Sequence, residues 1–171
     1  TAGTVTVTNA VAITGDHDQV TAALVTAGTK VEVTDATVTI NDNDATAITA
    51  AELSAIGGAT TGTVNLSGAV TISGTADEIT AALVTTGTKV VASKAGTTAI
   101  VAGTVSAQAG KDFNDINNVS ATFDGVSDTI GNLTNGSGNA ISSNLDVIVD
   151  ADGTVAITVS DADGTAITDQ H

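Results

Sequence analysis

The feature that most constrains the fold is an internal repeat with a fixed offset of 59 residues. Residues 3–31 recur as residues 62–90, and 18 of the 29 aligned pairs are identical. Several of the other pairs are conservative, such as Val7 with Leu66 and Val20 with Ile79. A fixed period of this length is typical of stacked-repeat proteins, in which each unit buries its apolar face against its neighbours. The sequence therefore predicts an array of similar units.

Each period contains a weaker half-repeat of about 30 residues, in the order strand, corner, strand, helix. Apolar residues alternate in the first strands, as at Val64 and Leu66, which is the pattern of a half-buried strand. First strands are expected at residues 4–7, 31–33, 63–66 and 90–92. Second strands carry the pairs Val11 and Ile13, Val38 and Ile40, and Val70 and Ile72.

Capping boxes mark the starts of the helices. The N-cap residues are Asp16, Thr49 and Thr75, and each is followed three positions later by a Gln or Glu that reaches back to the N-cap backbone. Helix ends are expected at Gly28, at residues 57–58 and at Gly87, because glycine readily adopts the left-handed conformation that ends a helix. A fourth helix is expected near residues 106–116, although Gly110 weakens it.

Alternating strands and short helices predict an α/β repeat solenoid with a parallel sheet over residues 1–131. An Asn/Gly/Ser-rich linker is expected at residues 132–144, followed by a β-rich tail over residues 145–171. The expected tail strands are residues 145–149, 155–159 and 166–168. The alternative is an all-β sandwich, in which the capping boxes are turns.

Composition excludes several classes of function. Four lysines oppose 19 carboxylates, and the formal net charge is −15, so nucleic acid is not an expected partner. No segment is long and apolar enough to span a bilayer, so membrane insertion is not expected. Without cysteine there are no disulfides or thiolate chemistry. No nucleophile, phosphate-loop or dinucleotide motif is present, and we do not expect an enzyme.

Acidic turns of the tail are the candidate metal site. The motif Asp-x-Asp-Gly occurs at residues 150–153 and 161–164, which places two oxygen ligands on one turn, and calcium takes six to eight oxygens. The alternative is that these Asp-Gly pairs only form hairpin turns. The predicted calcium ligands are Asp146, Asp150, Asp152, Asp161, Asp163 and Asp169.

Two other polar clusters have weaker metal interpretations. Residues 41–44 form a second oxygen-rich loop containing Asp42 and Asp44, for which a solvated loop is the favoured interpretation. His17 lies between Asp16 and Asp18, but Ala76 replaces it in the second copy of the repeat. Helix capping therefore explains that cluster better than metal binding.

Residues 48–64 and 70–76 resemble the Thr/Ala-rich tandem repeats of very large secreted surface proteins of marine bacteria, including cyanobacteria. Such proteins are treated as adhesin-like or surface-layer-like, and the resemblance covers about residues 1–125. Residues 36–44 also resemble the closing strand of a Calx-β repeat, and residues 150–164 resemble turns of immunoglobulin-like and cadherin-like modules. The resemblance implies an extracellular or cell-surface structural protein.

Two functions follow from these observations. The first is a structural subunit of an extracellular filament, sheath or surface layer, because the repeat begins at once and an uncapped end favours stacking of the next subunit. The second is an adhesin-type module that binds a glycan or a cell surface. The scarcity of aromatic residues, Phe113 and Phe123 alone, disfavours a glycan site.

Overall fold

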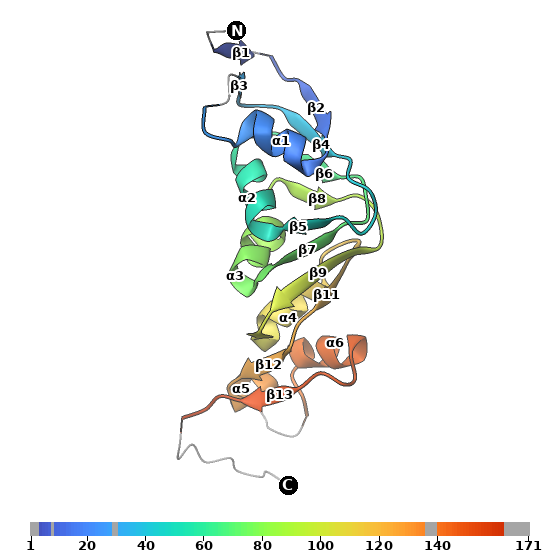
Figure 1. The fold of residues 1–171 in the computed structure, drawn as a ribbon. Coiled ribbons are helices and arrows are strands. Elements are labelled where there is room, and N and C mark those ends of the chain that lie inside the picture. Colours follow the sequence, from blue (N-terminus) through green and yellow to red (C-terminus); the bar gives the residue numbers. More distant parts are fainter. Residues whose placement is uncertain (1–3, 8, 29–30, 136–139, 163–171) are drawn as a thin grey trace.

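The protein has an α/β fold built on parallel strands (Figure 1). The computed structural model describes residues 4–7, 9–28, 31–135 and 140–162. In this part of the chain all strand ladders are parallel, and the one antiparallel contact is an isolated bridge between Thr134 and Ile141. The strands are β1 (Val5–Val7), β2 (Ala12–Gly15), β3 (Val31–Val33), β4 (Thr37–Ile40), β5 (Ala47–Thr49), β6 (Val64–Leu66), β7 (Thr71–Thr75), β8 (Val90–Ala92), β9 (Thr97–Ala102), β10 (Thr104–Val105), β11 (Val119–Thr122), β12 (Gly125–Asp128) and β13 (Ile157–Val159).

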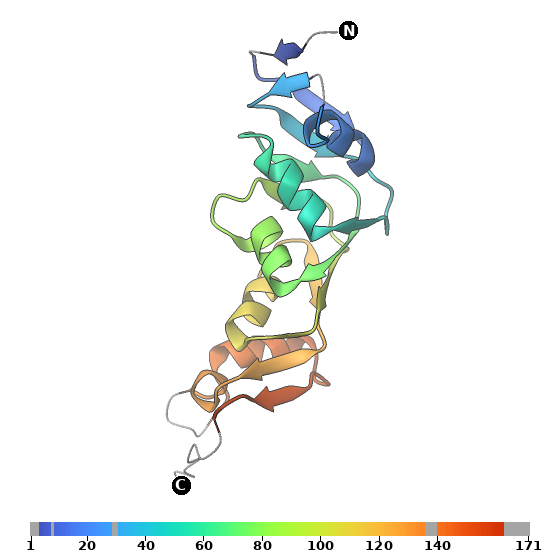
Figure 2. The same ribbon diagram turned by 60° about the vertical axis from the view of Figure 1, so that its left-hand side comes forward.

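Helices alternate with groups of strands along the chain. They are α1 (His17–Leu24), α2 (Ala50–Gly58), α3 (Ala76–Ile79) with its π-helical continuation η1 (Thr80–Val84), α4 (Ala107–Asn114), α5 (Ile130–Leu133) and α6 (Ser143–Ala151). The fold is elongated, with β1 near one end and β13 near the other, as the two views in Figures 1 and 2 show. These helices do not support the all-β alternative.

The three capping boxes are confirmed. The side chains of Asp16, Thr49 and Thr75 each accept a hydrogen bond from the backbone N–H three residues later, and the Gln or Glu at that position reaches back to the N-cap N–H. Helix α4 also begins where it was expected, with Ser106 as its N-cap. Local sequence therefore determines where these helices start.

The helix ends differ in part from expectation. Helix α2 ends at Gly58, but α1 ends at Leu24 and η1 ends at Val84. Gly28 and Gly87 lie in the turns that follow, with φ of 86° and 95°. Their left-handed conformation turns the chain toward the next strand after the helix has already ended.

The two halves of the 59-residue repeat are not alike, contrary to the expected 30-residue unit. Two strands precede α1 and α3, whereas three strands precede α2 and α4. The sheet orders are β1-β3, β2-β4-β6-β8, β5-β7-β9-β11 and β10-β12-β13. The additional middle strands, β4 and β9, each pair with the second strand of the unit before and with the first strand of the unit after. Each four-stranded sheet therefore takes one strand from each of four successive units, and that strand does not hold the same position in every unit.

Small and β-branched side chains fill the core between the units. Val38, Ile40, Ile48, Leu53 and Ile72 are at most 2% exposed. The backbones of neighbouring units also approach closely, because a Cβ at residue 62 would lie 2.2 Å from the carbonyl oxygen of Ala36, and a Cβ at residue 68 would lie 2.1 Å from that of Asp42. Glycine at these two positions allows the units to stack.

The expected strand over residues 145–149 is wrong, since these residues form part of helix α6. Ser142 caps this helix by accepting a hydrogen bond from the N–H of Leu145. Leu145 and Ile148 are buried. Ile148 packs closely against Gly110 of α4, because a Cβ added at Gly110 would lie only 2.6 Å from Cδ1 of Ile148. Helix–helix packing thus selects the helical spacing of these apolar residues. The second tail strand is present as β13, and residues 166–168 lie outside the described residues.

Candidate functional site

The tail carboxylates predicted to bind calcium are spread over several elements. Asp146 and Asp150 are exposed on α6, and Asp152 is the C-cap residue of that helix. The first Asp-x-Asp-Gly motif is therefore the end of a helix and not a hairpin turn. Asp163 and Asp169 lie outside the described residues. Among the described residues, no group of three or more His, Cys, Asp or Glu side chains could hold a metal ion.

Two of the predicted ligands have structural roles within the protein. Asp152 accepts hydrogen bonds from the backbone N–H and the hydroxyl of Thr154, at 2.9 and 2.7 Å, and these bonds lower the pKa of its carboxyl. Asp161 accepts a hydrogen bond of 2.6 Å from the N–H of Ile130, the first residue of α5. These contacts stabilise a turn and a helix terminus.

The contact of Asp161 belongs to a recurring arrangement that the sequence patterns above do not predict. Asp42 accepts from the N–H of His17 at 2.8 Å, and Asp128 accepts from the N–H of Ala107 at 3.0 Å. His17, Ala107 and Ile130 are the first residues of α1, α4 and α5, so in each case a carboxylate from a later unit satisfies a free helix N–H. In the sequence, the feature that these three carboxylates share is an Asp at or just after the end of a strand, and this feature could have predicted the arrangement.

These carboxylates are negatively charged next to a helix N-terminus, which is electrostatically favourable. For Asp128, burial by itself raises the carboxyl pKa. Hydrogen bonds from the Asn132 side chain and from the N–H groups of Thr129 and Ala107 outweigh burial, and the net pKa is below the ordinary 3.8. Such a charge stabilises the stack of units.

His17 and Asp42 form the most enclosed charged pair among the described residues. Nδ1 of His17 lies 2.8 Å from Oδ1 of Asp42, and the two side chains are 16% and 6% exposed. Burial lowers the pKa of His17, but the hydrogen bond to Asp42 and the charges of Asp42, Asp18 and Glu52 outweigh it, so the pKa is raised above 6.5. The pair joins the start of α1 to the corner after β4.

Asp44, in the same corner, has a different partner. The ammonium of Lys94 lies 2.7 Å from both of its carboxylate oxygens, and the N–H of Ala69 donates a hydrogen bond of 2.9 Å. These contacts, that of Lys94 first, lower the pKa of Asp44. The corner of residues 41–44 is therefore tied to three other segments through Asp42 and Asp44.

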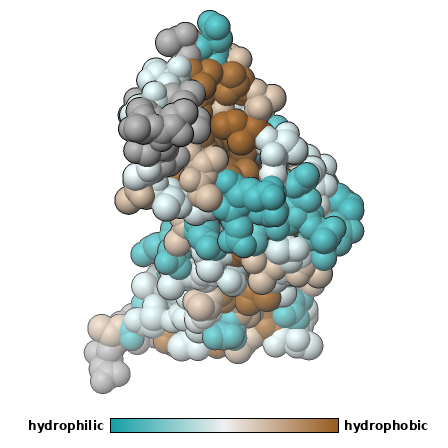
Figure 3. All heavy atoms as spheres, turned by 45° about the horizontal axis from the view of Figure 1, so that its top comes forward, coloured by the Kyte–Doolittle hydropathy of each residue, from teal (hydrophilic) through white to brown (hydrophobic). Residues whose placement is uncertain are grey.

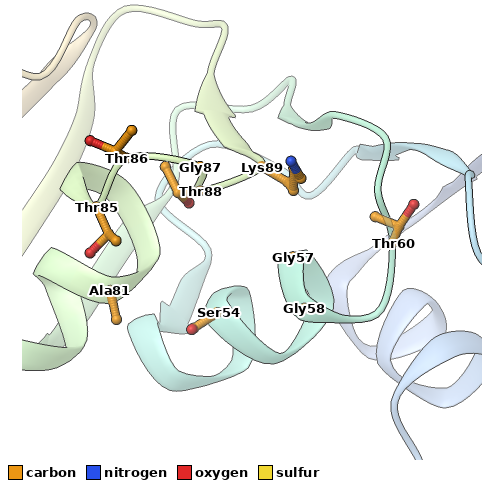
Figure 4. A pocket seen from close by; sticks show the side chains of 10 residues that line it. All are labelled: Ser54, Gly57, Gly58, Thr60, Ala81, Thr85, Thr86, Gly87, Thr88 and Lys89. Atoms are coloured by element: carbon orange, nitrogen blue, oxygen red, sulfur yellow. The ribbon is translucent and has the colours of Figure 1, made fainter.

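A groove of about 400 Å³ lies between α2, η1 and the turn before β8 (Figure 4). Its polar lining residues include Ser54, Thr86 and Lys89. Thr60 also lines the groove, but its hydroxyl already donates to the carbonyl oxygen of Ala36. Among the lysines that the structure describes, Lys94 and Lys111 form ion pairs and Lys89 forms none. This groove offers hydroxyl groups and one ammonium group to a small polar ligand.

An apolar surface lies at the end of the molecule where the chain begins. We call it the N-terminal face and define it by Val7, Val11, Ile13 and Leu24, together with the edge of β2 that has no strand partner among the described residues. These four side chains are only partly buried. Their repeat equivalents Leu66, Val70, Ile72 and Leu83 are between 0% and 8% exposed. Figure 3, in which this end is turned forward, shows hydrophobic surface there.

The opposite end has a related feature. Strand β13 is the last strand of its sheet, and its two apolar side chains, Ile157 and Val159, are 47% and 45% exposed. Two open strand edges with apolar side chains thus lie at the two ends of the described fold. Edges of this kind can pair with another chain.

Comparisons with known proteins yield no relative: no family model, no curated protein and no solved structure matches the chain. No helix in the described part of the chain is long and apolar enough to cross a membrane.

Proposed function

We propose that the chain is a structural subunit of an extracellular filament, sheath or surface layer. In this proposal its units form a solenoid, and copies assemble end to end by strand pairing. The extracellular location rests on the resemblance to secreted surface repeats. The absence of Cys, Met and Trp also suits a protein exposed to oxidants.

The observation that supports assembly best is the difference in burial between the two copies of the repeat. Ile72 is fully buried because β5 and α2 lie over it, whereas its equivalent Ile13 is only partly buried. The apolar residue is retained although, on the side of β2 away from β4, no neighbouring unit covers it among the described residues. A second chain that covers the N-terminal face would bury this surface as it is buried in the second copy.

Electron microscopy and light scattering of the purified chain test this proposal. We expect particles that lengthen with protein concentration and filaments of regular width. The variant Ile13→Lys should prevent assembly, because it places a charge on the N-terminal face. The matched control is Ile100→Lys, since Ile100 is 47% exposed on β9, a strand that is paired on both edges. A monomer at all concentrations, or equal effects of the two variants, would contradict the proposal.

The groove beside Lys89 favours a second candidate function, an adhesin-type module that binds a glycan or a cell surface. Hydroxyl groups and a lysine without an ion pair suit a polar or acidic sugar better than an apolar ligand. Binding of the monomer to a glycan array, lost in Lys89→Ala and kept in Lys94→Ala, would favour this function over assembly.

A further inference from the structure

The tail contains another copy of an internal segment. Residues 156–168 repeat residues 37–49 at an offset of 119, and seven of the 13 pairs are identical. Among the others are conservative pairs such as Val38 with Ile157 and Ile40 with Val159. Residues 37–49 comprise β4, the corner after it and β5. The tail therefore repeats the sequence of the additional middle strand and of the strand that follows it.

The described part of the tail also repeats the contacts of that segment. Strand β13 pairs with β12 as β4 pairs with β2, and Val126 lies opposite Ile157 as Ile13 lies opposite Val38. Just after the strand, Asp161 accepts a hydrogen bond from the first N–H of α5, as Asp42 accepts one from the first N–H of α1. In the corner, Gly164 stands in the sequence where Ala45 has a φ of 63°. Strand β13 is therefore the structural equivalent of β4.

The two equivalent strands differ at one edge. Strand β4 has β6 on its far side, and Val38 and Ile40 are fully buried. Strand β13 has no partner there among the described residues, and Ile157 and Val159 are almost half exposed. It lacks the partner that β6 provides for β4.

The other end of the chain offers the matching strands. By the 59-residue offset, β1 and β2 are the equivalents of β6 and β7, and no strand of the β4 or β5 type lies over them among the described residues. The residue types with which the second copy of the repeat contacts the unit before it also occur at the equivalent positions of the first copy. The hydroxyl of Thr60 donates to the carbonyl oxygen of Ala36, and Gly62 gives that carbonyl room, and the same residue types occur at Thr1 and Gly3.

We propose that β13 of one copy pairs in parallel with β1 of the next copy, in the register that β4 adopts with β6. This proposal rests on the end-to-end assembly proposed above and specifies its contact. Val38 lies opposite Val64, and Ile40 lies opposite Leu66. The equivalent register places Ile157 opposite Val5, Thr158 opposite Thr6 and Val159 opposite Val7. The contact joins two different surfaces, so it leaves a free surface at each end and forms open-ended chains.

Disulfide cross-linking tests the register, since the chain has no cysteine of its own. The double variant Thr6→Cys/Thr158→Cys places two thiols on neighbouring strands, about 4.8 Å apart between backbones, which is within disulfide range. Both positions are exposed, and the two strands lie far apart within one chain (Figure 1). Mild oxidation should then give a ladder of covalent oligomers on a denaturing gel.

Matched controls distinguish the proposed contact between β13 and β1 from other contacts between copies. A mixture of the two single variants should stop at covalent dimers that contain one chain of each kind. The double variant Thr6→Cys/Thr154→Cys moves one thiol out of β13 and into the turn that precedes this strand, and it should give no ladder. A chain extended by a second copy of residues 36–59 before Thr1 should cover the N-terminal face and remain monomeric. The unfolding temperature of each variant verifies that it is folded.

The possible results separate this contact from the proposed function. The two single variants, Thr6→Cys and Thr158→Cys, can also be oxidised separately. If both assemble and the Thr6→Cys chain alone forms covalent dimers with itself, two N-terminal ends meet and the proposed register is wrong. The register is also wrong if Thr6→Cys/Thr158→Cys forms normal filaments but gives no ladder. It is equally wrong if the extended chain forms normal filaments. In both cases end-to-end assembly itself still stands. If the unmodified chain forms no assembly at all, both proposals fail.

Discussion

Substituting Gly62 by Ala tests how closely the units are stacked. The added Cβ would lie 2.2 Å from the carbonyl oxygen and 2.8 Å from the carbonyl carbon of Ala36. Both atoms belong to backbone, so no flexible side chain can move aside. Strand β4 or β6 must shift by about 1 Å to reach an ordinary contact distance.

The expected cost follows from what that shift disturbs. Overpacking a tight interior contact costs about 3 kcal/mol. The shift also lengthens two hydrogen bonds between these units, from the N–H of Thr61 to the oxygen of Thr34 and from the hydroxyl of Thr60 to the oxygen of Ala36. Each contributes about 1 kcal/mol, so we expect a loss of roughly 4 to 5 kcal/mol in the free energy of unfolding. For a chain of this size the melting temperature should fall by more than about 8 °C.

The measurement is thermal and urea unfolding followed by circular dichroism, with Gly58→Ala as the control. Gly58 is the last residue of α2, and a Cβ there would meet nothing within 4 Å. The same chemical change should stabilise that helix by up to about 1 kcal/mol. If Gly62→Ala is as stable as the unmodified chain, the close approach of the units is wrong.

Four further predictions use the same unfolding assay. Thr75→Ala removes the N-cap of α3 and should cost about 1 kcal/mol, and an unchanged melting temperature would contradict the capping geometry. Ala45 has a left-handed φ of 63°, so Ala45→Gly should stabilise by up to about 1 kcal/mol, whereas Ala59→Gly, at φ −83°, should not. The pKa of His17 is raised in the folded protein, so its pairing with Asp42 stabilises below pH 6.5 and is lost as pH rises through the raised value; His17→Gln should remove that slope between pH 6 and 8. If calcium binds the tail carboxylates, chelator should lower the melting temperature, and identical curves with chelator and with saturating calcium would refute calcium binding.

Much of the secondary structure was determined by the sequence alone, because its signals are local. The capping boxes at Asp16, Thr49 and Thr75 lie within four residues of chain, and each starts a helix where it was predicted. Alternation at Val64 and Leu66 likewise predicted β6, because the two faces of a strand meet different environments. The α/β class follows from these local patterns.

Only the tertiary structure decided which strands pair and what the carboxylates do. The alternating pattern of β4 does not reveal its position within the repeat unit. Its two partners come from different units: β2 is the second strand of the unit before, and β6 is the first strand of the unit after. The apolar pattern of residues 145–149 predicts a strand, whereas contact with α4 selects a helix there. Asp42 and Asp161 resemble metal ligands in the sequence, but helix N–H groups more than 20 residues away in sequence are their partners. Each of these outcomes depends on contacts between distant segments, which a local pattern does not specify.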